Sequence, residues 1–428
     1  MNQYEYDFFV IGGGSGGVRA ARWAAAKGLK VGMAEGARLG GTCVNVGCVP
    51  KKLYFHAADL STTINNAAGF GWTIPSAMSH DWAALKTGID SYIQRLNGIY
   101  AGMLDRVGVT RHQAWARMIT EHDIELRYGE NTTTVSAAHI LLAPGSIPHL
   151  PTLEGVELAS TSDDFFALSD RPRSAAVIGG GYIGVEMAGI LAGLGVETTL
   201  AYRSNLPLRS FDQDVRTRLD RSLRAQVTVR SEATLQKLVG EENGLKQVYL
   251  SDSQSPIEAE FVLLATGRKP NTAPLNLESV GVELSPKRKA VIVDDEYRTN
   301  IPHIFAVGDV IDRMQLTPVA LAEGMRVVHQ IIGDPLPPLD YDLVPTTVFS
   351  HPNLGTVGLS EEEARDRGRS IKVYEADFKP LQQALQALPQ RVYMKMIVDL
   401  ESDKVIGCHM IGDEAGEQIQ GLAVAMQA

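Results

Sequence analysis

The chain has 428 residues and a mass of 46.3 kDa, which predicts two to four domains rather than one. Lys and Arg total 40 and Asp and Glu total 50, so the net charge is −10, which argues against general nucleic-acid binding. No apolar run reaches the roughly 18 to 20 residues that a membrane span needs. The segment Met1 to Asp7 lacks a basic leader and cleavage site, so we expect a cytoplasmic protein without membrane attachment.

The first motif lies between two apolar segments near the N-terminus. Residues 8–11 read as a strand, residues 18–28 as an Ala-rich helix and residues 29–35 as a second strand. The turn between the first strand and the helix carries a glycine fingerprint, and an acid follows 18 residues beyond its last glycine; the residues are Gly12, Gly14, Gly17 and Glu35. This is the dinucleotide-binding pattern in its proper context.

Each residue of the fingerprint has its own physical reason. Gly12 allows the tight turn, Gly14 lets the backbone approach a pyrophosphate, and Gly17 lets the helix pack closely on the strand. Free N–H groups at the helix start hold phosphates, and Glu35 can accept a hydrogen bond from a ribose hydroxyl. We therefore expect a bound dinucleotide here.

The same unit recurs in the middle of the chain. A strand is predicted at 174–178, a helix at 185–194 and a second strand at 196–202. The fingerprint between the first strand and the helix consists of Gly179, Gly181 and Gly184. Two such units predict two nucleotide sites on two Rossmann-like domains.

The second unit ends in basic rather than acidic residues. Tyr202 and Arg203 stand where the first unit has its acid, and Arg209 follows six residues later. Arginines can pair with a 2′-phosphate, which favours NADPH over NADH. The alternative is a pair of solvated surface arginines, and Gly184 is a counter-signal because NADP sites often carry Ala there.

Three later segments resemble buried strands that end in turns. Residues 140–145 and 261–267 both read as returns to the first domain, and residues 304–309 end in Asp309. That carboxylate can reach a ligand of the first domain, or instead cap a helix near Pro318.

The chain changes character from about residue 340. Strands are predicted at 344–349, 392–399 and 405–410, and a final helix at 414–426. Ser360 with Glu363 forms a capping box for a helix over 360–367. This region is predicted to be a third, α+β unit.

The cysteines point to redox chemistry rather than to a disulfide scaffold. Cys43 and Cys48 are five positions apart, about 7.5 Å on an ideal helix. A disulfide needs Cα atoms within about 7 Å, so a bond requires a distorted helix, which Gly47 makes easier. Lys51 and a helix N-terminus would stabilise a thiolate. The alternative is two buried structural thiols, and zinc binding lacks further ligands nearby.

The segment GGTCVNVGCVPKK is similar to the redox-active segment of the FAD-dependent pyridine-nucleotide disulfide reductases, and the resemblance covers the chain from Asp7 onward. It implies an α/β fold with two Rossmann-like domains and a C-terminal α+β interface domain. The implied boundaries are 1–145 for FAD binding, 146–270 for NADPH binding, 271–340 for a central domain that completes the FAD domain, and 341–428 for dimerisation. The further motifs that carry the resemblance are GGGSGG, GGGYIGVE, ATGRKPN, FAVGDV and LTPVA.

The resemblance also implies roles for individual residues. Cys43 would attack the substrate disulfide, Cys48 would lie against the flavin, Lys51 and Glu186 would form a pair near flavin N5, and Tyr182 would cover the flavin. The implied FAD-binding residues are Gly12, Gly14, Ser15, Gly16, Gly17, Glu35, Gly41, Thr42, Cys43, Gly47, Cys48, Lys51, Gly145, Gly308, Asp309, Leu316 and Thr317. The implied NADPH-binding residues are Gly179, Gly181, Tyr182, Ile183, Glu186, Arg203, Arg209, Gly267 and Arg268.

Within this family the motifs most resemble those of the glutathione reductases, which implies a homodimer that shares its active site and reduces glutathione disulfide. Ser15, Arg22 and Tyr100 would contact that substrate, and a cationic entrance suits its negative charge. Trypanothione reductases typically carry an acid and a Trp at the positions of Arg19 and Arg22. Dihydrolipoamide dehydrogenases typically end the second fingerprint with an acid, and mercuric reductases and large thioredoxin reductases rely on C-terminal redox groups that this sequence lacks.

The sequence departs from the family at two places. Ala143-Pro144-Gly145 replaces the usual Ala-Thr-Gly. Family members also continue into a segment whose His and Glu serve as acid/base for thiol exchange, and this sequence ends before it. We therefore expect slower disulfide exchange than in a typical member, or a flavoprotein without disulfide turnover, as alternatives to full activity; His351 and His409 are not expected to replace the missing His.

Overall fold

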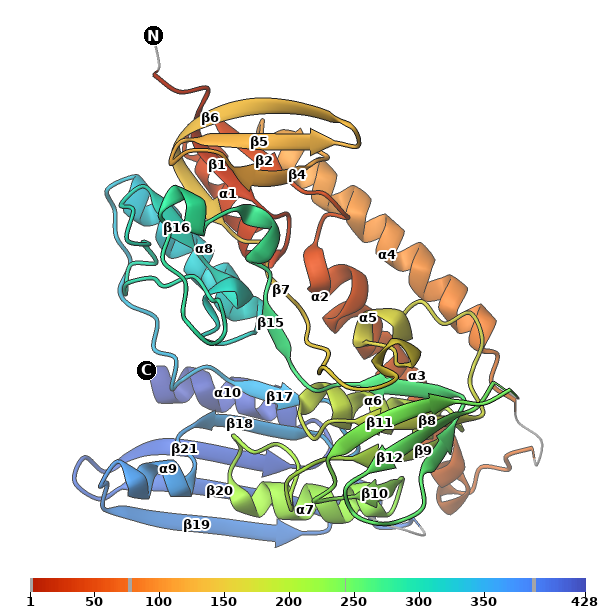
Figure 1. The fold of residues 1–428 in the computed structure, drawn as a ribbon. Coiled ribbons are helices and arrows are strands. Elements are labelled where there is room, and N and C mark those ends of the chain that lie inside the picture. Colours follow the sequence, from red (N-terminus) through yellow and green to blue (C-terminus); the bar gives the residue numbers. More distant parts are fainter. Residues whose placement is uncertain (1–2, 76–78, 243, 387–389) are drawn as a thin grey trace. The chain divides into compact units, whose positions relative to one another are not determined.

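The computed structural model describes residues 3–75, 79–242, 244–386 and 390–428 (Figure 1). The chain forms two compact units, which are considered separately. The first unit contains residues 1–50, 87–149 and 268–339, and the second contains residues 51–86, 150–267 and 340–428.

The first unit is built on a sheet in the strand order β3-β2-β1-β6-β5-β4, with β16 also paired to β6. The pairs from β3 to β6 and the pair β6–β16 are parallel, whereas β4, β5 and β6 form an antiparallel meander. The strands are β1 (Tyr6–Ile11), β2 (Val31–Ala34), β3 (Thr110–His112), β4 (Trp115–Met118), β5 (Asp123–Tyr128), β6 (Asn131–Leu142) and β16 (Ile304–Ala306).

The core of this unit explains its apolar strands. Phe8, Phe9 and Val10 of β1 are fully buried, as expected for a parallel strand covered on both faces. Helix α1 (Ser15–Ala26) packs against α8 (Thr317–Ile331). A Cβ at Gly324 would lie 2.8 Å from the Gly16 oxygen, so a glycine is needed where these two helices cross.

Shorter elements complete the first unit and lead out of it. Helix α2 (Gly41–Val46) lies in it, α3 (Cys48–Asn66) begins in it, and α4 (Trp82–Asp105) ends in it. Strands β7 (Ser146–Pro148) and β15 (Arg268–Pro270) form an antiparallel pair, which brings together the two ends of the long excursion between them. The 3₁₀ turns of this unit are η3 (Ala273–Leu275), η4 (Glu278–Val280) and η5 (Gly308–Ile311).

The second unit contains a parallel sheet in the order β10-β9-β8-β14, next to an antiparallel sheet of β11, β12 and β13. Its strands are β8 (Ser174–Ile178), β9 (Glu197–Ala201), β10 (Thr228–Arg230), β11 (Leu235–Gly240), β12 (Lys246–Leu250), β13 (Ile257–Ala259) and β14 (Phe261–Leu264). The helices are α5 (Ser162–Phe165), α6 (Tyr182–Gly193) and α7 (Gln213–Arg224), with 3₁₀ turns η1 (Ala67–Phe70) and η2 (Val156–Leu158).

One strand prediction is wrong in its location. Residues 261–267 were expected to return to the first domain, but β14 pairs in parallel with β8 in the second unit. An apolar strand can complete any parallel sheet, and its composition does not select the partner. The return is made a few residues later, by β15.

The remaining residues of the second unit form an antiparallel sheet in the order β17-β18-β21-β20-β19. Its elements are β17 (Thr346–Val348), β18 (Leu354–Gly358), α9 (Glu361–Asp366), β19 (Ile371–Phe378), η6 (Leu381–Gln383), β20 (Val392–Asp399), β21 (Lys404–Ile411) and α10 (Ala415–Gln427). The Ser360–Glu363 capping box at α9 is confirmed. The α/β fold class with a C-terminal α+β region is therefore confirmed.

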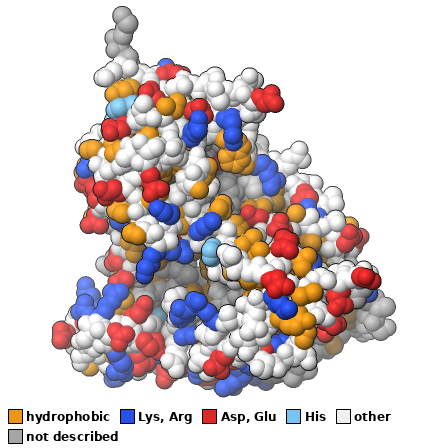
Figure 2. Space-filling model, in the orientation of Figure 1, with side chains coloured by type: hydrophobic (Ala, Val, Ile, Leu, Met, Phe, Trp, Pro, Cys, Tyr) orange, Lys and Arg blue, Asp and Glu red, His pale blue; other side chains and the backbone are white. Residues whose placement is uncertain are grey.

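Acidic and basic side chains are interspersed over the face drawn in Figure 2, in keeping with the near balance of the two kinds in the composition. Among the helices of the described ranges, none combines the length and the apolar character that a membrane crossing requires.

Candidate active site

At the first glycine fingerprint, backbone segments approach one another so closely that only glycine fits. Gly12 has φ +111°, and a Cβ there would lie 2.2 Å from the Ala143 oxygen. A Cβ at Gly17 would lie 2.0 Å from the Gly12 oxygen. Helix α1 begins after Gly14 with no side-chain cap among the described residues and no acid in its first turn. Its first N–H groups can therefore receive a phosphate, and the residues fit the pyrophosphate of a dinucleotide.

Glu35 extends this cradle from the end of β2. One carboxylate oxygen accepts from the N–H of Gly13 at 2.7 Å, and the other accepts from the N–H of Ala37 at 2.7 Å. These bonds hold the carboxylate at the glycine turn, where each oxygen keeps a lone pair for a ribose hydroxyl. The arrangement fits the adenosine half of FAD.

The dithiol lies in the first unit, at a break between α2 and the start of α3. Helix α2 ends at Val46, Gly47 adopts φ −149° and ψ −121°, and α3 starts at Cys48. A Cβ at Gly47 would lie 2.8 Å from the Thr42 oxygen, so the break depends on glycine. The distortion expected between Cys43 and Cys48 is present. Both cysteines are free thiols.

The two thiols interact with each other and with Thr317. A hydrogen bond to Cys48 and then burial raise the pKa of the Cys43 thiol, while the Thr317 hydroxyl opposes that rise. The Cys48 Sγ lies 3.8 Å from Thr317 Oγ1, and Ser15 Oγ lies 3.5 Å from the same oxygen. The structure thus brings together four of the predicted site residues.

A cavity of 510 Å³ lies beside these residues in the first unit. It contains two cations, Arg19 and Arg22, and the hydroxyls of Ser15 and Tyr100. Burial raises the pKa of Tyr100, and the charges of Cys43 and Cys48 raise it further. Ser15, which lines the cavity, lies 3.5 Å from the Thr317 hydroxyl that contacts Cys48. All three predicted substrate residues therefore line one cavity, whose lining residues are Ser15, Val18, Arg19, Arg22, Tyr100, Met103, Pro318, Leu321, Ala322 and Met325.

Asp309 is held by a chain of hydrogen bonds that involves residues of β7 and β15. Ser146 Oγ donates to Asp309 at 2.6 Å, and Arg268 Nε donates to Ser146 Oγ at 2.8 Å. Arg268 is buried, and it also donates to the Ser146 carbonyl at 2.8 Å. The alternative role of Asp309 as a cap of α8 is wrong, since none of the described side chains caps that helix. Contact of Arg268 with NADPH stays a prediction.

In the second unit, Lys51 and Glu186 form a buried ion pair at 2.8 Å. The same Glu186 oxygen accepts from the N–H of Phe349 at 2.8 Å. The Lys51 and Lys52 ammonium groups lie 4.0 and 4.1 Å from the centroid of the Phe349 ring. The predicted pair is thus formed, and Phe349 orients both of its members.

The second fingerprint repeats the first. A Cβ at Gly179 would lie 2.2 Å from the Ala265 oxygen, and one at Gly184 would lie 1.9 Å from the Gly179 oxygen. Gly184 is therefore required by packing. Helix α6 begins after Gly181, again without a side-chain cap among the described residues. Tyr182, the next residue, is 41% exposed.

The remaining predicted residues lie in the turns around these cradles. Gly41, Gly145, Gly267 and Gly308 all have positive φ, as their turns require. Leu316 precedes the first residue of α8. Thr42 and Ile183 lie in the first turns of α2 and α6, and Gly16 is buried in α1.

Two groups of residues escaped the sequence analysis. Asn45 donates to the carbonyls of Leu39 and Gly41 at 3.1 and 2.9 Å, and Asn97 donates to Asn45 and to Leu39, which fixes the loop before the dithiol. Lys395 lies buried among carboxylates. A lysine inside the apolar strand VYMKMIVD was the available signal for the second group.

The fold and the site define a dithiol oxidoreductase with two dinucleotide cradles. The chain matches the model of the pyridine nucleotide-disulphide oxidoreductases over residues 6–324 and the dimerisation-domain model of the same proteins over residues 344–428. The chain belongs to this family of oxidoreductases.

Its relatives make the resemblance more particular. It is 41% identical to a glutathione reductase of Burkholderia cepacia, over 100% of this chain and 94% of the relative. It is 38% identical to a glutathione reductase of Nostoc sp., over 99% and 94% of the two chains. It is 37% identical to the chloroplastic/mitochondrial glutathione reductase of Pisum sativum, over 100% and 78%.

Proposed function

We propose that the chain reduces glutathione disulfide to glutathione with NADPH, through FAD and the Cys43–Cys48 pair. The observation that carries this proposal is the cavity that joins Arg19 and Arg22 to the dithiol side of the first unit. Two guanidinium groups suit an anionic disulfide and disfavour a cationic one.

The residues divide the work of thiol exchange. The Cys43 thiolate attacks one sulfur of the substrate disulfide, forms a mixed disulfide and releases one glutathione thiolate. The Cys48 thiolate then attacks Cys43, forms the Cys43–Cys48 disulfide and releases the second glutathione, so two electrons leave the dithiol. The Thr317 hydroxyl favours the Cys43 thiolate. Arg22, Tyr100 and Ser15 position the substrate.

The cofactor sites follow from the two cradles. FAD, when bound, passes the electrons of NADPH to the disulfide. We assign residues 1–145 and 271–340 to FAD binding, residues 146–270 to NADPH binding and residues 341–428 to dimerisation. Arg203 and Arg209 are assigned to the 2′-phosphate. Glu186 and Lys51 are assigned to the flavin side of hydride transfer.

We also propose a homodimer whose two subunits share each active site, and a cytoplasmic location. The match of residues 344–428 to a dimerisation domain supports the dimer. Sedimentation would give the oligomeric state. Activity that falls on dilution together with dissociation of the dimer would test sharing, because a site completed across subunits is lost in the separated subunit. Fractionation of the source cells would test the location.

The main test uses three cysteine variants of the FAD-loaded protein. We expect Cys43→Ser and Cys48→Ser each to lower kcat/KM for glutathione disulfide by at least about 10³-fold, because each removes a sulfur that changes bonding. Cys408→Ser is the matched control, since that thiol is buried and burial raises its pKa to about 11. Turnover by Cys43→Ser at the wild-type rate would contradict the proposal.

The second candidate function is the reduction of another low-molecular-weight disulfide. The arginines of the same cavity allow a test, because they should favour an anionic substrate over a cationic one. Arg22→Glu is expected to lower kcat/KM for glutathione disulfide about 10- to 100-fold and to raise it for a cationic disulfide. If wild-type protein prefers trypanothione disulfide or lipoamide, the substrate assignment is wrong although the oxidoreductase class stands.

A further inference from the structure

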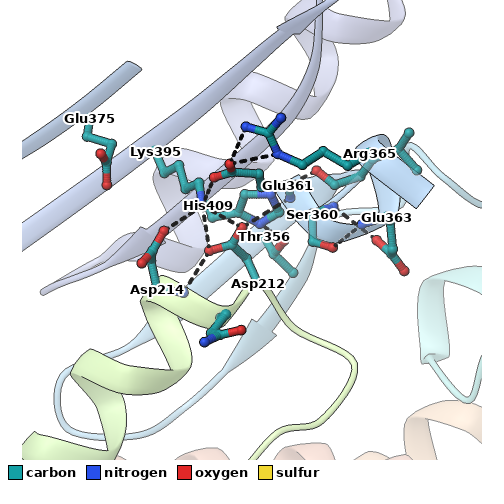
Figure 3. Close-up of polar contacts among 12 residues, drawn as sticks. Asp212, Asp214, Thr356, Ser360, Glu361, Glu363, Arg365, Glu375, Lys395 and His409 are labelled. Carbon is teal, nitrogen blue, oxygen red and sulfur yellow. Dashed lines mark hydrogen bonds and ion pairs between the residues drawn. The ribbon is translucent and has the colours of Figure 1, made fainter. Parts of the chain in front are cut away.

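A buried lysine lies in the C-terminal sheet of the second unit, among three carboxylates (Figure 3). The Lys395 side chain is 1% exposed and comes from the middle of β20. Its Nζ lies 2.9 Å from Asp212, 2.6 Å from Asp214 and 2.8 Å from Glu361. Burial disfavours the charge, but the hydrogen bonds to these carboxylates prevail and raise the pKa of Lys395. The ammonium is therefore charged.

The three carboxylates come from the starts of two helices, α7 and α9. Asp212 precedes α7 and is fully buried, Asp214 lies in the first turn of α7, and Glu361 begins α9. Asp212 also accepts from the N–H of Asp214 at 3.0 Å and from the N–H of Glu361 at 3.2 Å. One lysine thus joins the start of α7 to the C-terminal sheet.

His409 of β21 contributes to this cluster as a neutral group. Its Nδ1 faces the Thr356 hydroxyl at 2.5 Å, and its Nε2 faces the Leu359 carbonyl at 2.9 Å. Burial lowers the pKa of His409. Its two nitrogens are satisfied within the sheet, in keeping with a structural role for this histidine.

The start of α7 in turn holds the loop that carries the two proposed phosphate-binding arginines. Arg216 of α7 donates to the Pro207 carbonyl at 2.8 Å and to the Leu206 carbonyl at 3.3 Å. The N–H of Leu208 donates to the Gly180 carbonyl of the second fingerprint at 2.7 Å. Arg209 follows Leu208 directly, and it lies three residues before Asp212. The loop is therefore fastened to the fingerprint at one side and to α7 at the other.

We propose that Lys395 is a positioning residue for NADPH: by holding Asp212 it fixes α7 and, through Arg216, the loop of Arg203 and Arg209 at the distance that a 2′-phosphate requires. This inference rests on the proposed NADPH site. A buried ion cluster imposes one arrangement on the elements that it joins, because a carboxylate that loses its partner would be a bare buried charge. Nucleotide selectivity then depends on a residue of the dimerisation region that touches no nucleotide.

The test compares NADPH with NADH in Lys395→Met. We expect KM for NADPH to rise about tenfold and KM for NADH to change less than about twofold, because only the phosphate contacts are misplaced. Calorimetry with 2′,5′-ADP and with 5′-AMP on the FAD-loaded protein gives the same comparison without turnover. Lys404→Met is the matched control, since this lysine is exposed at the start of β21.

Asp214→Asn is a second variant that tests the same proposal if Lys395→Met does not fold. Asp214 is 43% exposed, so its loss is tolerated better, and we expect the same selective effect at about twofold to threefold. Folded variants whose preference for NADPH over NADH equals that of wild type would overturn the positioning role. If Arg203→Ala and Arg209→Ala also leave that preference unchanged, the proposed phosphate site itself is wrong. If only Arg203→Ala and Arg209→Ala change the preference for NADPH over NADH, the proposed phosphate site is supported and the positioning role of Lys395 is wrong.

Discussion

The two glycine fingerprints share one backbone construction and differ in the residue that ends the second strand of each unit. In both units, a Cβ placed on the first glycine would lie 2.2 Å from a backbone carbonyl oxygen. A Cβ placed on the last glycine would lie 1.9 to 2.0 Å from the carbonyl oxygen of the first glycine. In the first unit Glu35 binds two backbone N–H groups, whereas in the second Tyr202 is buried and donates its hydroxyl to Asp220 at 2.6 Å. The two units share the same glycine turn, so selectivity between nucleotides must come from residues other than these glycines.

The largest effects should come from the shared glycines. Gly17→Ala and Gly184→Ala each place a Cβ on a backbone carbonyl, and overpacking of this kind costs about 1–3 kcal/mol or more. We expect Gly17→Ala to lose bound FAD, and Gly184→Ala to keep FAD while KM for NADPH rises at least about tenfold. The ratio of flavin to protein absorbance and steady-state kinetics measure these effects.

Gly88→Ala is the control for both glycine variants, because a Cβ there meets no atom within 4 Å in helix α4. This change should be neutral or slightly stabilising. If Gly184→Ala loses FAD and Gly17→Ala does not, the two cradles have been assigned to the wrong cofactors.

The next effect concerns the arginines of the second unit. Arg203→Ala and Arg209→Ala should each raise KM for NADPH about 10- to 100-fold and leave KM for NADH nearly unchanged, because a hydrogen bond to a charged group contributes about 1.5–3 kcal/mol. Arg221→Ala, an exposed position in the last turn of α7, is the control. Equal losses with both nucleotides would show that the arginines do not read the phosphate.

A smaller effect is expected at Glu35. Glu35→Gln keeps one acceptor, but it removes the charge and one of the two backbone hydrogen bonds. We expect the Kd for FAD to rise about tenfold, while NADPH kinetics of the reconstituted protein stay normal. Titration of the apoprotein with FAD measures this, with Glu130→Gln at an exposed turn as the control. An unchanged Kd would remove Glu35 from the FAD site.

The smallest effect is expected at the equivalent position of the second unit. Tyr202→Phe removes the hydrogen bond to Asp220, whose carboxylate still binds Arg224 at 2.8 Å. Thermal unfolding should show a loss of about 1 kcal/mol. KM for NADPH should stay within about twofold of wild type, because the bond lies inside the domain. A rise in KM of about tenfold would mean that Tyr202 contacts the nucleotide after all.

Local patterns were sufficient for the elements around each fingerprint. Strands at 174–178 and 392–399 have the predicted bounds, and the capping box at Ser360 forms as expected. The reason is that periodicity, glycine turns and caps act within a few residues of chain. The position of residues 261–267 was predicted incorrectly because strand pairing joins segments far apart, and β14 lies beside β8.

The sequence alone determined the chemistry that adjacent residues carry: two dinucleotide cradles, a Cys43–Cys48 pair broken by Gly47, and basic residues after the second cradle. Only the tertiary structure decided which distant residues join them. It brought Ser15, Tyr100 and Thr317 to the dithiol, set Phe349 against Lys51 and Glu186, and buried Lys395 among three carboxylates. Such groups meet through packing of whole elements, and packing leaves no periodic signal in the chain.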